Sequence, residues 1–497
     1  MTFDHLISIC KPETVSGDEP DAIGSLQQDS RLIRKADVFL AVRGLIMDGH
    51  DFIGDAVARG ASAVICEELP ALNTGGAVFI RVESTRKLAG QLAQAFQGYP
   101  SADLSTVAVT GTNGKTTVAT LVWQVLQKMG VKSGLLGTVA KQYGDERSES
   151  RLTTADPVEI AADMRKMVNV GCTSLAMEVS SHALEQKRTD GINWNIAAFT
   201  NLSHDHLDYH GDMNRYVAAK RKLFDSLDRS ACAVVNADDP CGPEMVKNCR
   251  AKIIYFSFGK EASVRCKLHR SDETGLHILV GDTEIFTPLT GLFNAYNVAE
   301  AFLICRELGY NSSRISGALR ECGGAPGRLE KVTLHEETAI KPAVFVDYAH
   351  TPDALANVAS TLEGIRKKDQ LLVILFGCGG DRDMAKRPEM AKVAETYAGR
   401  IMVTSDNPRN EDPEKIIRDI EGGFYGSAEW TSVTSRKEAI RRAVLEAPAN
   451  AIVLIAGKGH ETVQEIGGKR MHFDDRDVAR KALDQYNGIK KQPEETG

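Results

Sequence analysis

The sequence has no apolar run long enough to cross a membrane. Its strongest runs, residues 371–376 and 451–456, fall far short of the roughly 20 residues that a spanning helix requires. The N-terminal segment also lacks the basic stretch and apolar core of a secretion signal. We therefore expect no signal peptide and no membrane insertion, and we interpret the two apolar runs as buried parallel strands.

Paired cysteine motifs are absent too. Ten cysteines are scattered singly between Cys10 and Cys378, and no two of them have CxxC spacing. This distribution is more typical of reduced thiols in a cytosol than of a disulfide framework. We expect a cytoplasmic protein in which the cysteines serve as small core residues.

An excess of basic charge is likewise missing. The chain carries 60 Lys and Arg against 67 Asp and Glu, which gives a net charge of −7. Nucleic acids and anionic lipids select basic faces, so this balance argues against either as the main partner. The sequence shows no internal repeat, and its hydrophobic content of 42% excludes disorder as the general state.

The length of 497 residues suggests about three domains of about 150 residues each. We predict an α/β protein with domains at residues 1–103, 104–336 and 337–497. The second and third regions alternate strands with helices, which indicates mostly parallel sheets. The expected strands lie at 106–110, 173–179, 195–201 and 231–237, and near 343, 371, 400 and 451. A hairpin turning at Gly467-Gly468 and a last helix from near Asp475 follow.

The most specific pattern is a glycine loop between a β-rich run and an amphipathic helix. The loop reads Gly-Thr-Asn-Gly-Lys-Thr-Thr at residues 111–117. Its backbone N–H groups would face the β and γ phosphates of a nucleotide, Lys115 would add a positive charge, and the Thr116 hydroxyl would hold Mg²⁺. The loop departs from the common G-x-x-x-x-G-K-[ST] motif, whose first glycine would fall at Val109.

Acidic residues and histidines form a second pattern. Glu178 lies near the carboxyl end of an expected strand, and residues 204–210 interleave histidines with aspartates. Taken alone, this segment could be a zinc site or a set of loop caps. A nucleotide brings Mg²⁺, which prefers oxygen ligands, so Glu178 with one histidine is the favoured set. Lys220 follows on a helix beside Arg221 and Lys222, where a solvated face is the ordinary interpretation.

Together these residues resemble the Mur ligase family, the ATP-dependent amide-forming enzymes of peptidoglycan synthesis, which also includes folylpolyglutamate synthetases. The resemblance is carried by residues 111–116, 178–182, 201–208, 294–297, 327–330 and 347–353. Residues 377–388 and 456–461 are similar to the branch of the family that adds the third peptide residue. The resemblance implies a UDP-binding N-terminal domain, a central ATP-binding domain of the phosphate-loop type, and a C-terminal Rossmann-like domain that brings the amino acid.

The resemblance also implies ATP as co-substrate, two Mg²⁺ ions, and CO₂ that carbamylates Lys220. Lys115, His206 and Lys220 would be catalytic. Thr116 would support one metal ion, and Glu178, His206 and the carbamylated Lys220 would support the other. ATP would contact Gly111, Thr112, Asn113, Gly114, Lys115, Thr116, Thr117, Asn297, Arg328 and Asp347. The UDP-linked substrate would contact Ser30, Thr153, Thr154, Ser181, Gln186 and Arg188.

The reaction implied is the transfer of meso-diaminopimelate to the D-glutamyl γ-carboxylate of UDP-N-acetylmuramoyl-L-alanyl-D-glutamate, through an acyl phosphate. Meso-diaminopimelate differs from lysine by a distal carboxylate, and Arg409 offers a planar fork for that group. The amino-acid pocket would contain Arg382, Asp406, Asn407, Pro408, Arg409, Gly457 and Glu461. A plainer interpretation of this segment is a turn at Asn407-Pro408 with Arg409 as a surface charge.

Three alternatives remain open at this point. The first is a lysine-adding ligase of the same type, and the second is a ligase similar to folylpolyglutamate synthetases. The third is a nucleotide-dependent binding or switch protein without ligase activity, in which residues 406–409 and 457–461 have no role. All expected partners are small molecules, and we expect a monomer.

Overall fold

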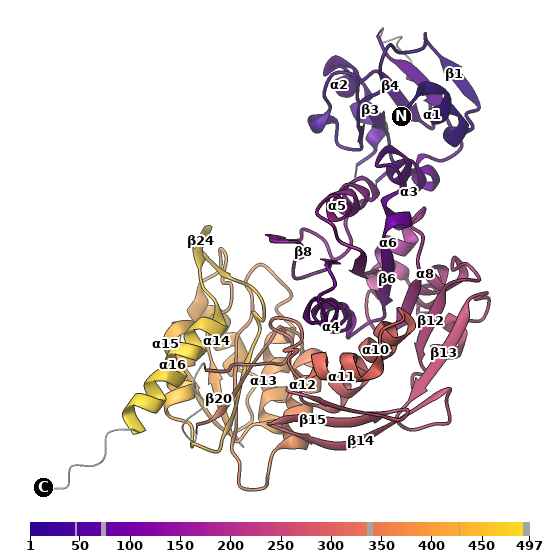
Figure 1. Ribbon diagram of the computed structural model, residues 1–497. Coiled ribbons are helices and arrows are strands. Elements are labelled where there is room, and N and C mark those ends of the chain that lie inside the picture. Colours follow the sequence, from indigo (N-terminus) through magenta and orange to yellow (C-terminus); the bar gives the residue numbers. More distant parts are fainter. Residues whose placement is uncertain (45–46, 71–75, 335–340, 427, 491–497) are drawn as a thin grey trace, which may run out of the picture. The chain divides into compact units, whose positions relative to one another are not determined.

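The structure is a computed structural model that describes residues 1–44, 47–70, 76–334, 341–426 and 428–490. It divides into two compact units (Figure 1). The first unit comprises Met1–Cys266 with Asn297–Ala318, and the second comprises Lys267–Tyr296 with Leu319–Gly497. The three predicted domain ranges stay a prediction, and the boundary expected at residue 336 lies outside the described residues.

The first unit begins with a five-stranded sheet of order β1-β5-β4-β3-β2. Its strands are β1 (Thr14–Ser16), β2 (Leu26–Gln27), β3 (Val38–Leu40), β4 (Ala63–Cys66) and β5 (Val78–Arg81). Side chains alternate between the two faces because successive residues of a strand point in opposite directions. One face packs on α1 (Phe3–Cys10) and α3 (Thr85–Phe96), and the other packs on α2 (Ile53–Ala58).

A larger sheet in the same unit places the phosphate loop. Its central strand β6 (Ser105–Thr110) pairs in parallel with β10 (Ser174–Glu178) and β11 (Ile196–Phe199). The sheet continues in parallel through β12 (Cys232–Asn236) and β13 (Lys252–Ser257) on one side and β7 (Ser133–Leu136) on the other. The antiparallel strands β8 (Lys141–Tyr143) and β9 (Glu146–Ser148) complete that second side. The carboxyl ends of β6, β10 and β11 therefore share one edge, where ligands of open α/β sheets bind.

Helices carry further site residues of this unit. They are α4 (Lys115–Lys128), α5 (Pro157–Asn169), α6 (Ser181–Glu185), α7 (Leu207–His210), α8 (Met213–Asp225), α9 (Gly242–Met245) and α11 (Ser312–Leu319). Helix α4 starts directly after the loop that follows β6, and its apolar residues are buried against the sheet. Helix α8 starts at an N-cap in which the Asp212 side chain accepts a hydrogen bond from the backbone N–H of Arg215.

The second unit has a six-stranded sheet of order β17-β18-β22-β19-β20-β21. The strands are β17 (Glu330–Lys331), β18 (Ala343–Asp347), β19 (Leu372–Phe376), β20 (Arg400–Val403), β21 (Glu429–Ser432) and β22 (Ile452–Ala456). One face packs on α12 (Pro352–Ile365), α13 (Lys386–Tyr397) and α14 (Pro413–Glu421). The opposite face packs on α15 (Arg436–Leu445) and α16 (Asp475–Lys490). Helices on both faces explain why its central strands β19 and β22 are apolar throughout.

Smaller elements complete the chain. Strand β14 (Val264–Asp272) leads from the first unit into the second, where β15 (Gly275–Val280) and β16 (Thr283–Thr287) follow, and α10 (Leu292–Glu307) leads back. The hairpin of β23 (Val463–Ile466) and β24 (Lys469–His472) turns at the predicted glycines, because Ile466 pairs with Lys469. All the strands expected from residue 106 onward are confirmed. Within the described residues, no helix is both long and apolar enough to cross a membrane.

Candidate active site

The phosphate loop can form only with glycine at two positions. Gly111 has φ +150°, and a Cβ there would lie 1.9 Å from the Thr200 hydroxyl oxygen. Gly114 has φ +86°, and a Cβ there would lie 2.5 Å from Oδ1 of Asn297 on α10. Both the backbone conformation and the available space therefore exclude a side chain. The predicted nucleotide residue Asn297 thus lies directly against the loop.

The loop is tied to the end of β11 by a reciprocal pair of hydrogen bonds. The Asn113 N–H donates to Oδ1 of Asn201 at 3.0 Å, and Nδ2 of Asn201 donates to the Asn113 carbonyl at 3.1 Å. Lys115 is the first residue of α4, and its Nζ donates to the carbonyls of Gly111 at 2.9 Å and Thr112 at 2.8 Å. A cation and a helix N-terminus therefore meet at one place, an arrangement suited to an anion.

Two of the predicted metal ligands lie in direct contact. The Thr116 hydroxyl donates to Oε2 of Glu178 at 2.7 Å. Thr138, two residues beyond β7, also donates to this carboxylate, from its N–H at 2.7 Å and from its hydroxyl at 3.1 Å. Only 1% of the Glu178 surface is exposed, so these donors stabilise a buried carboxylate. The sequence analysis did not identify Thr138, although its place just after a strand is a usable signal.

Lys220 is buried, so the interpretation of its helix face as solvated is wrong at this position. Only 1% of the Lys220 surface is exposed, and its Nζ donates to the Gly111 carbonyl at 2.7 Å. The Nζ also lies 4.7 Å from the centre of the Tyr216 ring. Burial lowers the pKa of Lys220 well below its usual value, and the nearby charge of Lys115 lowers it further. The neutral amine is therefore more favourable in the folded protein than in the unfolded chain.

His206 lies in a cluster of aromatic rings beside this lysine. Its ring centre is 4.8 Å from that of His182 and 6.3 Å from that of Tyr216. The His206 side chain is 45% exposed, and its Nε2 lies 3.4 Å from Oδ2 of Asp205. Burial and the neighbouring histidines lower the pKa of His182 to about 4, so His182 is neutral at physiological pH. Among the described residues, no three His, Cys, Asp or Glu side chains converge as a metal site.

The structure connects five of the six residues predicted to hold the UDP-linked substrate, directly or through neighbouring residues. Nη1 of Arg188 donates to the Thr154 carbonyl at 2.8 Å, and Nη2 of Arg188 donates to Oε1 of Gln186 at 2.7 Å. The Thr153 hydroxyl accepts a bond of 3.1 Å from the Thr138 hydroxyl. The Ser181 hydroxyl lies 3.0 Å from Nε2 of His210, and Nε2 of Gln186 donates to the hydroxyl of the preceding residue, Tyr209, at 3.1 Å.

The sixth residue, Ser30, lies elsewhere in the first unit. It begins the short helix η1 (Ser30–Leu32), close to the five-stranded sheet. It is buried, and the hydrogen bonds recorded among the described residues do not join it to the other five. An extended substrate would be required to contact both places.

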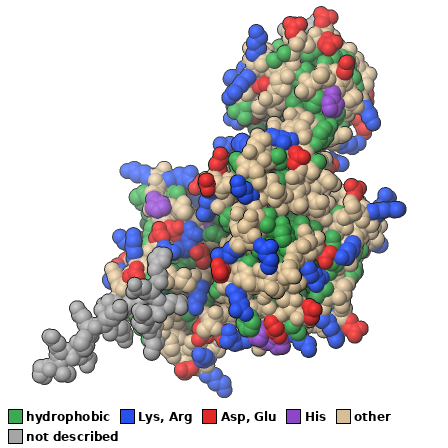
Figure 2. Space-filling model, viewed as in Figure 1, with side chains coloured by type: hydrophobic (Ala, Val, Ile, Leu, Met, Phe, Trp, Pro, Cys, Tyr) green, Lys and Arg blue, Asp and Glu red, His purple; other side chains and the backbone are tan. Residues whose placement is uncertain are grey.

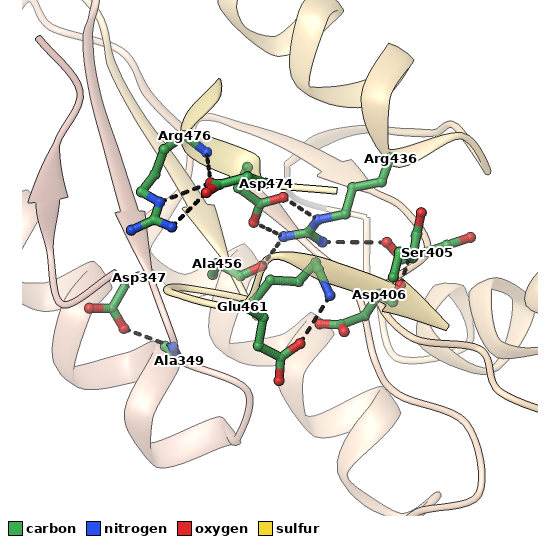
Figure 3. A network of polar contacts seen from close by, with 12 residues as sticks. Asp347, Ala349, Ser405, Asp406, Arg436, Ala456, Glu461, Asp474 and Arg476 are labelled. Atoms are coloured by element: carbon green, nitrogen blue, oxygen red, sulfur yellow. Dashed lines mark hydrogen bonds and ion pairs between the residues drawn. The ribbon is translucent and has the colours of Figure 1, made fainter. Parts of the chain in front are cut away.

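In the second unit, Asp347 and Arg328 lie close together. Asp347 ends β18, and its carboxylate accepts a hydrogen bond from the N–H of Leu329 at 2.6 Å. It also accepts one from the N–H of Ala349 at 2.7 Å (Figure 3). The Arg328 guanidinium lies over the Tyr348 ring at 5.0 Å. Burial raises the pKa of Asp347, although Arg328 and the two N–H groups act in the opposite direction.

The predicted amino-acid pocket combines groups of opposite charge. Nδ2 of Asn407 donates to Oε2 of Glu461 at 2.9 Å, and Nζ of Lys458 donates to the same oxygen at 3.0 Å and to Oδ1 of Asn407 at 3.1 Å. Burial acts to raise the pKa of Glu461, but the charge and hydrogen bond of Lys458 outweigh it and lower the pKa. Glu461 is therefore an anion at neutral pH. The sequence analysis assigned no role to Lys458, although its segment was noted.

Arg409 lies on the same loop as Asn407 and is held rather than free on the surface. Its Nη1 donates to the Gly380 carbonyl at 2.5 Å, and its side chain is only 25% exposed. A Cβ on Gly379 would lie 3.0 Å from Nη1 of Arg409 and 3.9 Å from Cγ of Arg382. Arg409, which was predicted to bind a carboxylate, and Arg382, which was predicted to belong to the same pocket, are therefore neighbours across this glycine.

Asp406 and Gly457 lie behind this loop, beside a buried ion pair. A Cβ on Gly457 would lie 2.5 Å from Oδ2 of Asp406, so the two residues touch. Arg436 binds Asp475 through two hydrogen bonds of 2.7 and 2.6 Å, with both side chains fully buried. Nη2 of Arg436 also donates to the Ala456 carbonyl (Figure 3). Burial raises the pKa of Asp406, an effect that Arg436 and Lys458 oppose. The sequence analysis missed Arg436 and Asp475, which lie far apart in sequence.

Comparisons with known proteins agree with this arrangement. Three family models match the chain: the Mur ligase family catalytic domain over residues 22–97, the Mur ligase middle domain over 109–305, and the Mur ligase glutamate ligase domain over 327–459. The UDP-N-acetylmuramoyl-L-alanyl-D-glutamate–2,6-diaminopimelate ligase of Cytophaga hutchinsonii is 40% identical over 487 residues, which cover 97% of this chain and 99% of that protein. The ligase of the same name from Geobacillus kaustophilus is 40% identical, with coverages of 94% and 96%.

Solved structures give the same result. A structure of a UDP-N-acetylmuramoyl-L-alanyl-D-glutamate–2,6-diaminopimelate ligase superposes with a TM-score of 0.73 at 32% identity, covering 97% of this chain and 99% of that one. A folylpolyglutamate synthase of Mycobacterium tuberculosis, at 19% identity and a TM-score of 0.57, shares the fold. From the family models, the relatives that match nearly the whole chain and the shared fold, we conclude that the chain belongs to the Mur ligase family of ATP-dependent ligases.

Proposed function

We propose that the chain joins meso-diaminopimelate to the D-glutamyl γ-carboxylate of UDP-N-acetylmuramoyl-L-alanyl-D-glutamate, with hydrolysis of ATP to ADP and phosphate. The observation that carries this proposal is that Arg409 lies next to Arg382 across Gly379, and that ionised Glu461 accepts a hydrogen bond from Asn407, two residues before Arg409. The arginines suit a carboxylate, and Glu461 suits an ammonium group. An amino acid whose distal end bears both groups satisfies this set, whereas lysine leaves the arginines unpaired.

The chemistry proceeds through an activated carboxylate. The γ-carboxylate attacks the γ-phosphorus of ATP, the bond to the β,γ-bridging oxygen breaks, and ADP leaves. The amine of diaminopimelate then attacks the acyl carbon, the C–O bond to phosphate breaks, and the amine loses a proton as the amide forms. Two anions must approach in the first step, so Lys115 and the N–H groups at the start of α4 would offset their repulsion.

Thr116 and Glu178 fit a resident Mg²⁺ ion because both offer oxygen atoms, and the Thr116 hydroxyl and a carboxylate oxygen of Glu178 lie 2.7 Å apart beside the loop. A bound Mg²⁺ ion supplies electrostatic stabilisation of the charge on the transferred phosphoryl group. We assign a second Mg²⁺ site to Glu178, His206 and Lys220, with Lys220 carrying a carbamate. The oxygens of that carbamate match the preference of a hard cation, and His206 would supply a nitrogen ligand.

The remaining substrate contacts complete the proposal. ATP would lie along residues 111–117 with Asn297, Arg328 and Asp347 as further contacts. The UDP-linked substrate would extend from Ser30 to the network of Thr153, Thr154, Ser181, Gln186 and Arg188, because a long molecule with separate UDP and peptide ends suits two separate places. We assign the reaction to the cytoplasm, where ATP is available, and to a monomer.

A competition assay tests the function. The protein is incubated with ATP, Mg²⁺, the UDP-dipeptide and equal amounts of labelled meso-diaminopimelate and lysine, and the UDP-tripeptide is separated by chromatography. We expect ADP and diaminopimelate-containing tripeptide in equal amounts. Preferential incorporation of lysine would contradict the specificity, and ADP release that does not depend on the UDP-dipeptide would contradict ligation.

Replacement of the specificity arginine gives a sharper test. In Arg409→Ala we expect kcat/KM for diaminopimelate to fall about 100-fold, since a charge-assisted bidentate contact contributes about 3 kcal/mol. Acyl-phosphate formation, measured as ADP release with hydroxylamine as trap, should stay within about twofold of the wild type. Arg418→Ala on α14 is the control, because that arginine is 63% exposed. Equal loss of both activities in Arg409→Ala would assign Arg409 a structural role.

A further inference from the structure

The two arginines of the amino-acid pocket lie on different loops. Arg382 belongs to the loop after β19, and Arg409 belongs to the loop after β20. The two strands are parallel neighbours, with Phe376 opposite Val403, so both loops leave the same edge of the sheet. The spacing of the two guanidinium groups therefore depends on how the two loops are held together.

The loops meet through backbone contacts that leave no room for side chains. The Gly380 N–H donates to the Asn407 carbonyl at 2.9 Å, and a Cβ on Gly380 would lie 1.9 Å from the Pro408 carbonyl oxygen. Asp381 and Arg409 both have left-handed backbone conformations, with φ of +52° and +53°. Such conformations are energetically unfavourable in residues other than glycine, so surrounding contacts must stabilise them.

Glu411 supplies one of these contacts. Its Oε1 accepts a hydrogen bond of 2.6 Å from the N–H of Asp381, the residue directly before Arg382. Its own N–H donates to the Pro408 carbonyl at 3.0 Å, next to Arg409. Nδ2 of Asn410 adds a bond of 2.9 Å to Oδ2 of Asp381. A single carboxylate thus connects the residue before one arginine with the turn that carries the other.

Arg387 holds Glu411 in turn, from helix α13. Its Nη2 donates to both carboxylate oxygens of Glu411 at 2.9 Å, and its Nη1 donates to Oδ2 of Asp419 on α14 at 2.7 Å. The Arg387 side chain is fully buried, whereas those of Glu411 and Asp419 are 20% and 32% exposed. Nothing in the proposed mechanism uses this arginine. The guanidinium serves the two acids from two separate nitrogens in a rigid plane, whereas an ammonium would have to reach both from a single nitrogen.

We propose that Arg387 is a positioning residue that sets the spacing of Arg382 and Arg409, and with it the preference for an amino acid that carries a distal carboxylate. This inference rests on the proposed function. A displacement of about 1 Å in a binding group reduces activity by up to about 100-fold. Loss of the Arg387 guanidinium should therefore change recognition of the amino acid and leave the phosphate loop, which lies in the other unit, unaffected.

The test compares Arg387→Lys with Arg418→Lys. The control arginine lies on α14, 3.6 Å from Asp412, and is 63% exposed. In Arg387→Lys we expect KM for diaminopimelate to rise about tenfold, the preference for diaminopimelate over lysine to fall by a similar factor, and KM for ATP and for the UDP-dipeptide to stay within about twofold. Arg418→Lys should match the wild type in all of these values. Unchanged KM for diaminopimelate, or a parallel change in all three KM values, would overturn the inference.

Amide hydrogen exchange of the intact protein tests how the two loops are held, independently of any activity assay. In Arg387→Lys and in Glu411→Gln, amide exchange should become faster in residues 379–382 and 407–411 and stay unchanged in β19 and β20. If exchange in these loops is unaltered, the inference is wrong whichever amino acid the enzyme uses. If the wild type incorporates lysine or nothing, the proposed function fails, and the exchange measurement still decides the role of Arg387.

Discussion

At the scale of single residues, Lys220 is the side chain whose environment departs furthest from its type. Lysine is seldom buried without an acidic partner because removing an ammonium from water is costly. Here Nζ contacts the Gly111 carbonyl, to which Lys115 also donates, and the Tyr216 ring. A neutral amine is the form that attacks CO₂, so the lowered pKa is consistent with the proposed carbamate.

Replacing Lys220 should separate stability from activity. In Lys220→Met we expect a free energy of unfolding that is unchanged or raised by about 1–2 kcal/mol, because the cost of burying the polar Lys220 amine is removed. Ligase activity should fall at least about 100-fold. Denaturant unfolding and the tripeptide assay measure the two effects. Lys222→Met, an exposed lysine on the same helix, is the control. A clear loss of stability in Lys220→Met would mean that the lysine is needed for the fold.

The pH dependence of stability follows from the direction of the same shift. The pKa of Lys220 is lower in the folded protein than in the unfolded chain, so between the two values the unfolded chain binds more protons. The free energy of unfolding of the wild type should therefore rise with pH in this window, relative to Lys220→Met. Unfolding in bicarbonate-free buffer between about pH 7 and about pH 9 measures the difference. A difference that shrinks with rising pH would contradict a lowered pKa.

At the scale of elements, both sites lie where parallel strands end. The loop after β6 receives Glu178 from β10 and Asn201 from the segment after β11, and the loops after β19 and β20 carry the two arginines. Parallel strands bring their carboxyl ends to one edge, so residues distant in sequence meet there. This geometry requires close approach of backbone segments, which explains glycine at the contact points.

Alanine at two glycines separates steric contact from backbone strain. Gly111 lies in the loop before α4, and Gly130 follows the end of α4. Both have positive φ, but a Cβ on Gly130 would meet nothing within 4 Å. We expect Gly130→Ala to lower the free energy of unfolding by about 1 kcal/mol with KM for ATP unchanged. Gly111→Ala should lower the free energy of unfolding by more than this and raise KM for ATP at least about tenfold, because Thr200 must move. Equal effects of the two substitutions on KM would contradict a steric role for Gly111.

At the scale of the whole molecule, net charge and local charge have opposite signs. The chain carries −7, yet ATP, the UDP-dipeptide and diaminopimelate all bear anionic groups. On the face that Figure 2 shows, basic and acidic side chains are interspersed rather than gathered by sign. Attraction of the substrates must therefore come from cations close to each site, such as Lys115, Arg188 and Arg409.

Ionic strength tests this division. If local cations dominate, raising the salt concentration from about 0.05 to about 0.5 M should raise KM for ATP and for the UDP-dipeptide severalfold. Salt weakens the attraction between these cations and the anionic substrates, although it screens contacts of a few ångströms less than contacts over a full Debye length. A sucrose series of matched viscosity serves as control. A fall in KM with salt would mean that repulsion by the net charge governs binding.

The sequence by itself determined the alternation of strands and helices, the phosphate loop and the apolar parallel strands. These features are local, since the period of apolar residues and the glycines of a turn act within a short segment. Motif resemblance added the candidate residues, among them Glu178, Asn407 and Arg409. The alternatives of a free surface arginine and a solvated Lys220 were also reasonable from local context, because burial of a charged side chain has no local pattern.

Only the tertiary structure decided which charges are buried and what holds them. Thr138 reaches Glu178, Lys458 reaches Glu461, and Arg387 reaches Glu411 across separate segments of the chain. The energy of each pair depends on distance and on the removal of water, and both are properties of the packed fold. Chain order therefore placed the predicted site residues at the ends of strands, and packing determined their burial and spacing.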